Sequence, residues 1–434
     1  MLKNLWYLIL GFTCAQSLCA CQGQPSPTSQ LFIDQGTELE IDQGAGREAE
    51  PEVSQDQNVD LEADVIIQPN EYSLIDLEAD PLSKGPAHVG YMSEDIAYRT
   101  AFDDQERNVR LVFWYPGQAN TGEGDASYPL FSPDQAEANA RPKIDHTAPL
   151  LVYSHGAKVW PEMGAFMAEY FASHGWVVLA VAHTGDSLDN VAGERPDQIY
   201  AWRPLDLSAA LDHLEDLSSD HPLKGLVNTQ KVLVSGHSFG GYTTLVSAGA
   251  QFDLDYLQNT HCHARGGRLC ESLMGPLGTR LANGFFDTRF SAAIPQSAGN
   301  YNFLRSGTSA IQIPVLMITA TRDQSCTEEG SNQPFWDALS HEDSVLRQQH
   351  KRLSFLEAGH ATFTTACQHL PYLEQDDGCG PDFTPYHEAQ QLMLAYSLIF
   401  ARAHILGDSK ALEAISLDEG LPNRESWVEW LSVQ

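Results

Sequence analysis

Short runs of consecutive apolar residues recur along the middle of this chain, and longer segments with helical spacing separate them. The runs cover residues 110–116, 149–154, 176–181, 231–235, 290–295, 315–320 and 352–356, and the helical segments cover 165–174, 205–217, 242–250 and 387–404. A strand that is apolar along its whole length is typical of a parallel sheet buried on both faces. The pattern therefore predicts an α/β fold, with a mostly parallel, doubly wound sheet covered by helices.

The start of the chain has a different pattern. Lys3 precedes a short apolar stretch, which is typical of a secretory signal peptide and predicts one over residues 1–20. The motif Leu-Cys-Ala-Cys at 18–21 is similar to a bacterial lipobox, in which the last cysteine, here Cys21, carries lipid. Gln22 follows it in place of Asp, which favours an outer-membrane lipoprotein. The alternative is ordinary signal-peptidase cleavage, which would give a soluble secreted or periplasmic protein.

Residues 21–85 form an acidic segment whose only basic residues are Arg47 and Lys84. It has no periodic apolar pattern, so it cannot bury enough apolar surface to offset its chain entropy. We expect a disordered linker; a propeptide is the alternative. The whole chain carries a net charge of −33, which excludes nucleic-acid binding because no basic stripe is present. The one membrane contact expected is the lipid anchor.

Residues 86–407 are predicted to form the α/β domain, and 408–434 a tail. The tail carries Trp427, Val428, Trp430 and Leu431, which we expect on a small amphipathic helix docked on the domain; a partner-binding helix is the alternative. The pattern indicates no oligomeric state.

The motif Gly-His-Ser-Phe-Gly at 236–240 lies between a predicted strand and a helix of small residues. This context is the one that a nucleophile elbow requires, because the serine must project from a tight turn at the end of a strand. Ser238 is therefore the candidate nucleophile. Phe239 opens the helix, so its N–H is available to an oxyanion. Ala157, which follows Gly156 after another strand, is the second candidate oxyanion donor.

A serine nucleophile needs a base and an acid that orients the base. Asp323 and His360 each follow a predicted strand and come after Ser238 in the required order. Asp186 is a rival acid, but it precedes the serine, and we expect a salt bridge or turn cap there. Glu357 is a second rival, too close to His360 along the chain. His155 and His237, which flank glycines, are expected to make local hydrogen bonds.

Together these motifs resemble the predicted dienelactone hydrolases, a group similar to plasma-type platelet-activating-factor acetylhydrolases and to bacterial polyester hydrolases. The motifs that carry the resemblance are Tyr-Ser-His-Gly at 153–156, Trp-Arg-Pro-Leu-Asp at 202–206, the 236–242 elbow and Gly-His-Ala-Thr-Phe at 359–363. The resemblance implies the α/β-hydrolase fold and matches Ser238, Asp323 and His360 to nucleophile, acid and base. Acetylhydrolase-like members place the acid one strand earlier, where this chain has no carboxylate. True dienelactone hydrolases use cysteine as nucleophile, which argues against dienelactone as substrate.

Five cysteines remain beyond the predicted signal peptide and Cys21, an odd number that leaves at least one thiol unpaired in an oxidising compartment. The resemblance implies disulfides between Cys262 and Cys270 and between Cys367 and Cys379, with Cys326 unpaired.

The expected reaction is two-step acyl transfer from a carboxylic ester, a small-molecule, lipid-like or polyester substrate of short to medium chain length. It requires no metal or organic cofactor. Two alternatives stay open: a peptidase or acyltransferase of the same fold, and a non-catalytic, lipid-anchored binding protein.

Overall fold

A single mixed sheet of ten strands forms the centre of the domain. The computed structural model describes residues 76–190, 195–339, 344–416 and 428–432. The strands lie across the sheet in the order β10 (Val428–Ser432), β9 (Lys351–Phe355), β8 (Leu316–Ala320), β7 (Phe290–Gln296), β6 (Val227–His237), β4 (Ala148–Ser154), β5 (Val177–Ala182), β2 (Glu106–Gly117), β1 (His88–Arg99) and β3 (Ala136–Ala138). The six strands from β9 to β5 are parallel, so their carboxyl ends meet at one edge of the sheet.

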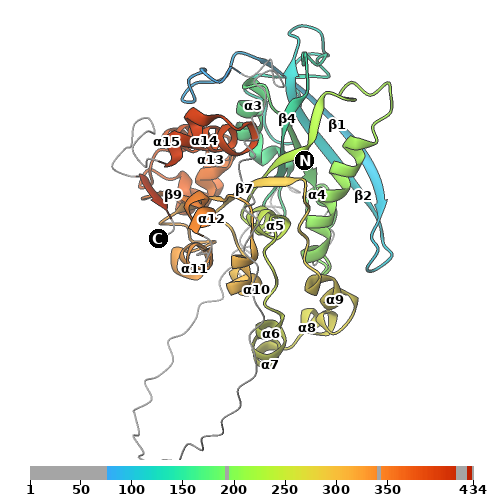
Figure 1. Ribbon diagram of the computed structural model, residues 1–434, viewed down its shortest axis with the longest axis vertical. Coiled ribbons are helices and arrows are strands. Elements are labelled where there is room, and N and C mark those ends of the chain that lie inside the picture. The colour runs from blue at the N-terminus through green and yellow to red at the C-terminus, as the bar shows by residue number, and fades with distance from the viewer. Residues whose placement is uncertain (1–75, 191–194, 340–343, 417–427, 433–434) are drawn as a thin grey trace, which may run out of the picture.

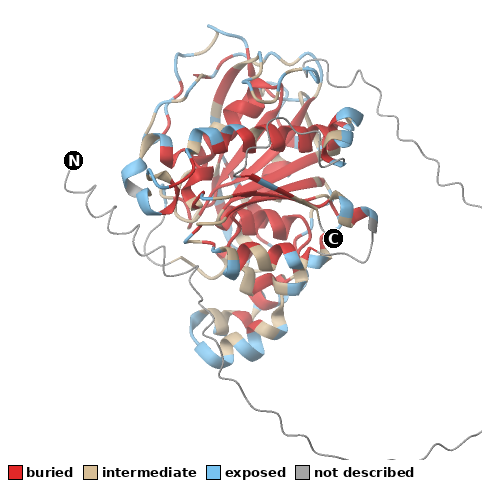
Figure 2. Ribbon diagram, turned by 90° about the vertical axis from the view of Figure 1, so that its left-hand side faces the viewer, coloured by how far each residue is buried: buried red, intermediate tan, exposed pale blue. Residues whose placement is uncertain are grey.

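Helices cover both faces of this sheet, as Figure 2 shows by the buried strands between two helical layers. Successive residues of a strand point to opposite faces: Leu150 and Val152 pack into one core, and Leu151 and Tyr153 into the other. The helices are α3 (Ala165–Ser173), α4 (Ile199–Glu215), α5 (Phe239–Ser247), α6 (Leu254–Tyr256), α7 (Cys262–Arg265), α8 (Arg268–Leu273), α9 (Pro276–Ala282), α10 (Tyr301–Leu304), α11 (Gln333–Ala338), α12 (Ser344–Gln349), α13 (Ala366–His369), α14 (Tyr386–Ala401) and α15 (Ser409–Ser416).

Helix α4 begins earlier than the sequence pattern predicts, because it runs through Pro204. A proline inside a helix leaves the carbonyl four residues earlier without its usual donor. Here that carbonyl belongs to Tyr200, and it accepts a hydrogen bond of 2.9 Å from the Tyr242 hydroxyl on α5. A tertiary contact therefore replaces the lost helical bond.

The described part of the tail is not helical at Val428, Trp430 and Leu431, which were expected on a helix; Trp427 lies outside the described residues. Helix α15 occupies its start, but residues 428–432 form strand β10, antiparallel to β9 at the edge of the sheet. Val428 and Trp430 are buried and Glu429 between them is exposed, an alternation with a period of two. Trp430 lies against Tyr396 of α14, at 5.2 Å between ring centroids.

The ordered chain begins before residue 86, the predicted start of the domain. Arg402, at the end of α14, donates hydrogen bonds to the main-chain carbonyls of Asp76, Leu77 and Ala79. The Tyr170 hydroxyl donates to Pro81 O. Residues 76–85 thus belong to the domain rather than to the linker. The predicted signal peptide, Cys21 and linker residues up to 75 lie outside the described residues.

Residues 251–288 leave the sheet between α5 and β7 as an excursion of small helices, α6 to α9, which project from the lower end of the domain in Figure 1. A disulfide between Cys262 and Cys270 closes part of it. Across the described parts of the chain, none of the helices has the length and apolar character needed to cross a membrane.

Candidate active site

Ser238 occupies the turn between β6 and α5 in a backbone conformation that non-glycine residues rarely adopt, with φ of 58° and ψ of −116°. Such a conformation costs about 1–3 kcal/mol and persists only where neighbouring structure enforces it. Its amide donates to Gln296 O at 2.9 Å, and its carbonyl accepts from Gly299 N at 3.2 Å. A Cβ at Gly240 would lie 1.8 Å from Ser154 O, so the helix can pass this close to β4 only with glycine there.

Asp323 and His360 form a hydrogen-bonded pair in the loops after β8 and β9. His360 Nδ1 lies 2.8 Å from Asp323 Oδ2, and the other carboxylate oxygen accepts the amides of Ser325 and Cys326. The Asp323 side chain is fully buried, and burial raises its pKa above the ordinary value, against the opposing effect of His360. The His360 side chain remains 14% exposed.

His237 connects this pair to the serine. Its ring centroid lies 4.4 Å from that of His360, and its Nε2 lies 3.0 Å from His360 O. A carbonyl accepts only, so Nε2 carries the proton. Burial and the neighbouring His360 lower the pKa of His237 well below its ordinary value, so the ring is neutral. It is a local hydrogen-bonding residue, as the sequence predicts, and it brings His360 beside the residue that precedes Ser238.

The two candidate oxyanion donors lie on either side of the serine. Phe239 is the first residue of α5, and a Cβ at Gly156 would be 3.5 Å from the Ser238 Cβ, so the loop that carries Ala157 runs past Ser238. Within the described part of the chain, neither the Ala157 nor the Phe239 amide donates to a protein acceptor.

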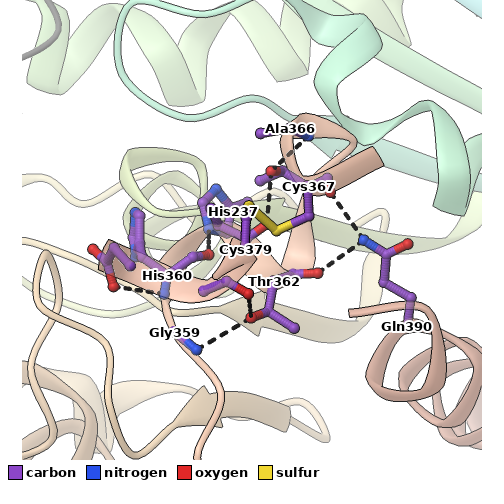
Figure 3. The surroundings of a disulfide bond; sticks show 12 residues. His237, Gly359, His360, Thr362, Ala366, Cys367, Cys379 and Gln390 are labelled. Atoms are coloured by element: carbon purple, nitrogen blue, oxygen red, sulfur yellow. Dashed lines mark hydrogen bonds between the residues drawn. A yellow bond between two sulfur atoms is a disulfide. The ribbon is translucent and has the colours of Figure 1, made fainter. Parts of the chain in front are cut away.

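The His360 loop is secured by a second segment, residues 375–379 (Figure 3). The Asp377 carboxylate accepts the His360 amide at 2.9 Å and, from the acid's loop, the Ser325 hydroxyl at 3.0 Å. The disulfide between Cys367 and Cys379 ties this segment to α13. One carboxylate therefore joins the loops that carry Asp323 and His360.

The rival acids have other partners. Glu357 is exposed and pairs with Arg322 at 3.2 Å. Asp186 forms the expected salt bridge, but as a fully buried one rather than at the surface. It lies 2.6 Å from Arg203 and 2.7 Å from Arg195.

No family model matches the chain. The platelet-activating factor acetylhydrolase of Cavia porcellus is 23% identical to it in an alignment 222 residues long, and the match covers 38% of this chain and 51% of that protein. The chain thus spans about half the length of this curated relative. Among solved structures, a ferulic acid esterase from Streptomyces cinnamoneus is similar at a TM-score of 0.53 and 20% identity, over 82% of this chain and 98% of that one. The chain has the α/β-hydrolase fold. This confirms the predicted fold class and the predicted resemblance to acetylhydrolases.

Two features of the candidate site are not indicated by the sequence pattern. Asp377 lies in an acidic loop with no motif, and only the folded chain shows that it accepts the His360 amide. Arg203 and Asp206 belong to the motif at 202–206, which contributes to the family resemblance but does not by itself indicate what these side chains do. Arg203 is completely buried beside Ser154, and Asp206 bonds to His183 at 2.9 Å.

One group of possible metal ligands occurs in the described residues: Asp323, Cys326 and His360, whose donor atoms lie within 4.8 Å of one another. Cys326 is a buried thiol. Because Asp323 and His360 already bind each other, an acid–base pair accounts for their arrangement.

Proposed function

We propose that this protein is a serine hydrolase that cleaves carboxylic esters through an acyl-enzyme. The observation that carries the proposal is the constrained turn at Ser238 beside the hydrogen-bonded pair of His360 and Asp323. A strained serine between a strand and a helix serves nucleophilic catalysis rather than stability. The similarities to an acetylhydrolase and to a ferulic acid esterase support ester hydrolysis as the reaction.

In this mechanism Ser238 Oγ attacks the ester carbonyl carbon while His360 Nε2 accepts the hydroxyl proton. The hydrogen bond from Nδ1 to Asp323 fixes the tautomer that leaves Nε2 as acceptor. The tetrahedral oxyanion is bound by the Ala157 and Phe239 amides. His360 then donates its proton to the leaving alcohol, and the acyl group is released when His360 activates a water molecule.

The substrate we propose is an ester of short to medium chain length, lipid-like or polymeric. We also propose that the protein is exported, because two disulfides persist in an oxidising compartment. Lipid attachment at Cys21 is part of this proposal. Mass spectrometry of the mature N-terminus tests it, and an unmodified cysteine there would leave a soluble exported enzyme.

The test of the proposed reaction is Ser238→Ala, assayed on nitrophenyl esters of graded chain length and on the matching anilides. We expect kcat to fall by about 10⁴–10⁶-fold with the fold intact. Ser247→Ala is the matched control, because that buried hydroxyl at the far end of α5 has no hydrogen-bond partner. Retention of activity in a folded Ser238→Ala protein would contradict the proposal, and faster cleavage of anilides than of esters would redirect it to a peptidase.

A further inference from the structure

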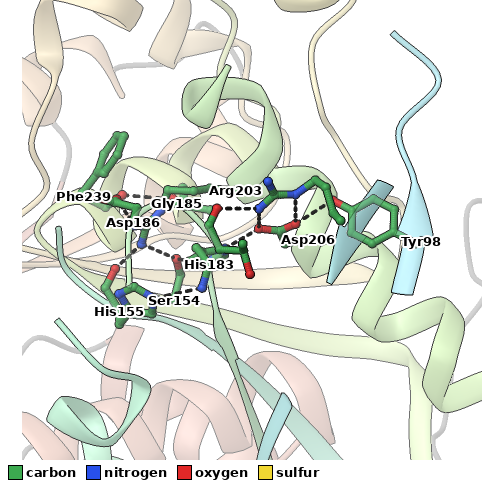
Figure 4. Close-up of polar contacts among 12 residues, drawn as sticks. Tyr98, Ser154, His155, His183, Gly185, Asp186, Arg203, Asp206 and Phe239 are labelled. Carbon is green, nitrogen blue, oxygen red and sulfur yellow. Dashed lines mark hydrogen bonds and ion pairs between the residues drawn. The ribbon is translucent and has the colours of Figure 1, made fainter. Parts of the chain in front are cut away.

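Arg203 connects the two chain segments that flank Ser238. Its side chain is completely buried on α4, and its guanidinium reaches both the loop after β4 and the first turn of α5 (Figure 4). We propose that Arg203 is a positioning residue of the oxyanion hole, which holds the Ala157 and Phe239 amides in register with each other. This inference rests on the proposed function, since it concerns the same site.

On the side of β4, Arg203 Nη2 donates to the carbonyl of His155 and, at 3.1 Å, to Ser154 Oγ. Its partner Asp186 contributes to the same loop through the main chain, because Asp186 O accepts the amide of Lys158 at 2.9 Å. The residues on both sides of the Gly156–Ala157 peptide are therefore fixed by one ion pair.

The His155 ring transmits this restraint to the donor itself. Its Nε2 lies 3.1 Å from the His183 amide, which can only donate, so Nδ1 carries the proton and donates to Gly156 O at 2.6 Å. Gly156 O and the Ala157 N–H belong to one planar trans peptide and point in opposite directions. By holding the carbonyl on one side, His155 directs the Ala157 N–H to the other.

On the side of α5, Arg203 Nε donates to Thr243 Oγ1 at 3.0 Å, and that hydroxyl donates to Phe239 O at the same distance. The guanidinium carbon also lies 4.6 Å from the centre of the Phe239 ring. Both contacts restrain the residue whose amide is the second oxyanion donor.

The charge of Arg203 is retained in this setting. Burial lowers its pKa to about 10, so it remains a cation at neutral pH, and Asp186 at 2.6 Å balances it. A rigid planar cation with five donors can bind several acceptors at fixed angles, which the single ammonium of a lysine cannot.

The test compares Arg203→Lys with Arg107→Lys. Arg107 is also buried and pairs with Asp206, but it contacts neither donor segment. For Arg203→Lys we expect kcat on a short nitrophenyl ester, per folded enzyme, to fall by about 10²-fold, with KM changed less than about threefold, since misplaced catalytic groups cost about this much. Inhibition by butylboronic acid, which forms a tetrahedral adduct on the serine, should weaken by a similar factor. Arg107→Lys should change neither quantity by more than about threefold.

Thr243→Val keeps the test decisive if Arg203→Lys fails to fold, because it removes one link alone; we expect about a fivefold loss of kcat and of boronate affinity. Equal losses in the Arg203 and Arg107 variants, or unchanged boronate affinity in both Arg203→Lys and Thr243→Val, would overturn the positioning role. Neither result affects the proposed reaction, which is tested separately by Ser238→Ala and by the comparison of esters with anilides.

Discussion

The proposed active site has two halves, a nucleophile half and an acid–base half named for their proposed roles, and they are held in place by different means. The nucleophile half is built on β4, β6 and α5, whose close packing and buried ion pairs fix Ser238 and the loop beside it. The acid–base half lies on loops after β8 and β9, where one carboxylate and one disulfide hold Asp323 and His360. The packing of the strands involves many contacts across the sheet, whereas the two loops are held by a few side-chain contacts that single substitutions can remove. The acid–base half should therefore be the easier one to disturb without unfolding the domain.

Burial also disfavours a different ionised group in each half, a protonated histidine in one and a carboxylate in the other. His183, under the nucleophile half, has its pKa lowered to about 3, first by burial and then by Arg203. Below pH 6.5 His183 is protonated in the unfolded chain but stays neutral in the folded protein, so the stability of the fold falls as the pH drops. Glu374, beside the base, has its pKa raised to about 7, mainly by burial. There the folded state retains a proton that the unfolded chain loses, so stability falls as the pH rises from about 4.5 to 7.

The largest effect expected is that of the acid. Asp323→Asn should keep the fold and lower kcat by about 10³–10⁴-fold, because an amide in that place favours the wrong His360 tautomer. Asp186→Asn should act mainly on stability, by about 3–5 kcal/mol, since it leaves a buried cation incompletely paired. Steady-state kinetics and thermal unfolding of both variants measure the contrast; a greater loss of kcat in folded Asp186→Asn would show that the acid is misassigned.

Next in size is the disulfide beside the base. Replacing Cys367 and Cys379 by serine should lower kcat by about 10- to 100-fold, because the His360 loop loses its restraint. The double serine variant at Cys262 and Cys270 is the matched control. The two disulfides span 12 and 8 residues, so either should cost about 2.5–3 kcal/mol of stability. Equal kcat values in the two double variants at equal stability would show that the acid–base half is not the easier one to disturb.

A smaller effect is expected at Asp377. In Asp377→Asn one oxygen remains to accept the His360 amide, but the bond to the Ser325 hydroxyl is weakened. We expect kcat to fall by about fivefold with KM unchanged, since only the alignment of the acid with the base is altered. Asp382→Asn, an exposed change in the neighbouring loop, serves as control. Identical kcat values for the two variants would show that Asp377 has no part in this alignment.

The smallest effect concerns Glu374. Gln cannot ionise, so Glu374→Gln should raise the melting temperature by about 1–3 °C at pH 8, where the half-buried carboxylate is charged, and change it much less at pH 5. Calorimetry at the two pH values measures this. A shift of the same size at both would attribute the effect to packing instead of charge.

Much of the parallel sheet could be predicted, because buried strands are recorded as uninterrupted apolar runs. Ser238, Asp323 and His360 could be nominated because each follows such a run, and the structure places them in adjoining loops; their catalytic roles stay predictions. The sequence of the strand at Val428–Ser432 alternates between apolar and polar residues at its start, as a strand requires. The two tryptophans in a short tail nevertheless suggested an amphipathic helix.

Other features depend on partners far away in the sequence and leave no local pattern. Residues 76–79 are held by Arg402, more than 300 residues later, which donates hydrogen bonds to three of their carbonyls. The role of Asp377 depends on a loop folded back upon His360. The start of α4 could not be predicted either, because a proline at 204 usually ends a helix. Here the Tyr242 hydroxyl donates the hydrogen bond that the proline cannot.

The attachment of residues 76–79 to Arg402 fixes where the described chain begins relative to the candidate site. Gln390, near the start of α14, donates to the carbonyls of Thr362 and Thr364 behind the base, whereas Arg402 lies at the opposite end of the same helix. Twelve residues of helix separate the two contacts by about 18 Å. Asp76, the first described residue, therefore lies at the end of α14 remote from His360. The edge of the sheet that carries Ser238 and His360 is thus separated from Asp76 by most of the length of this helix.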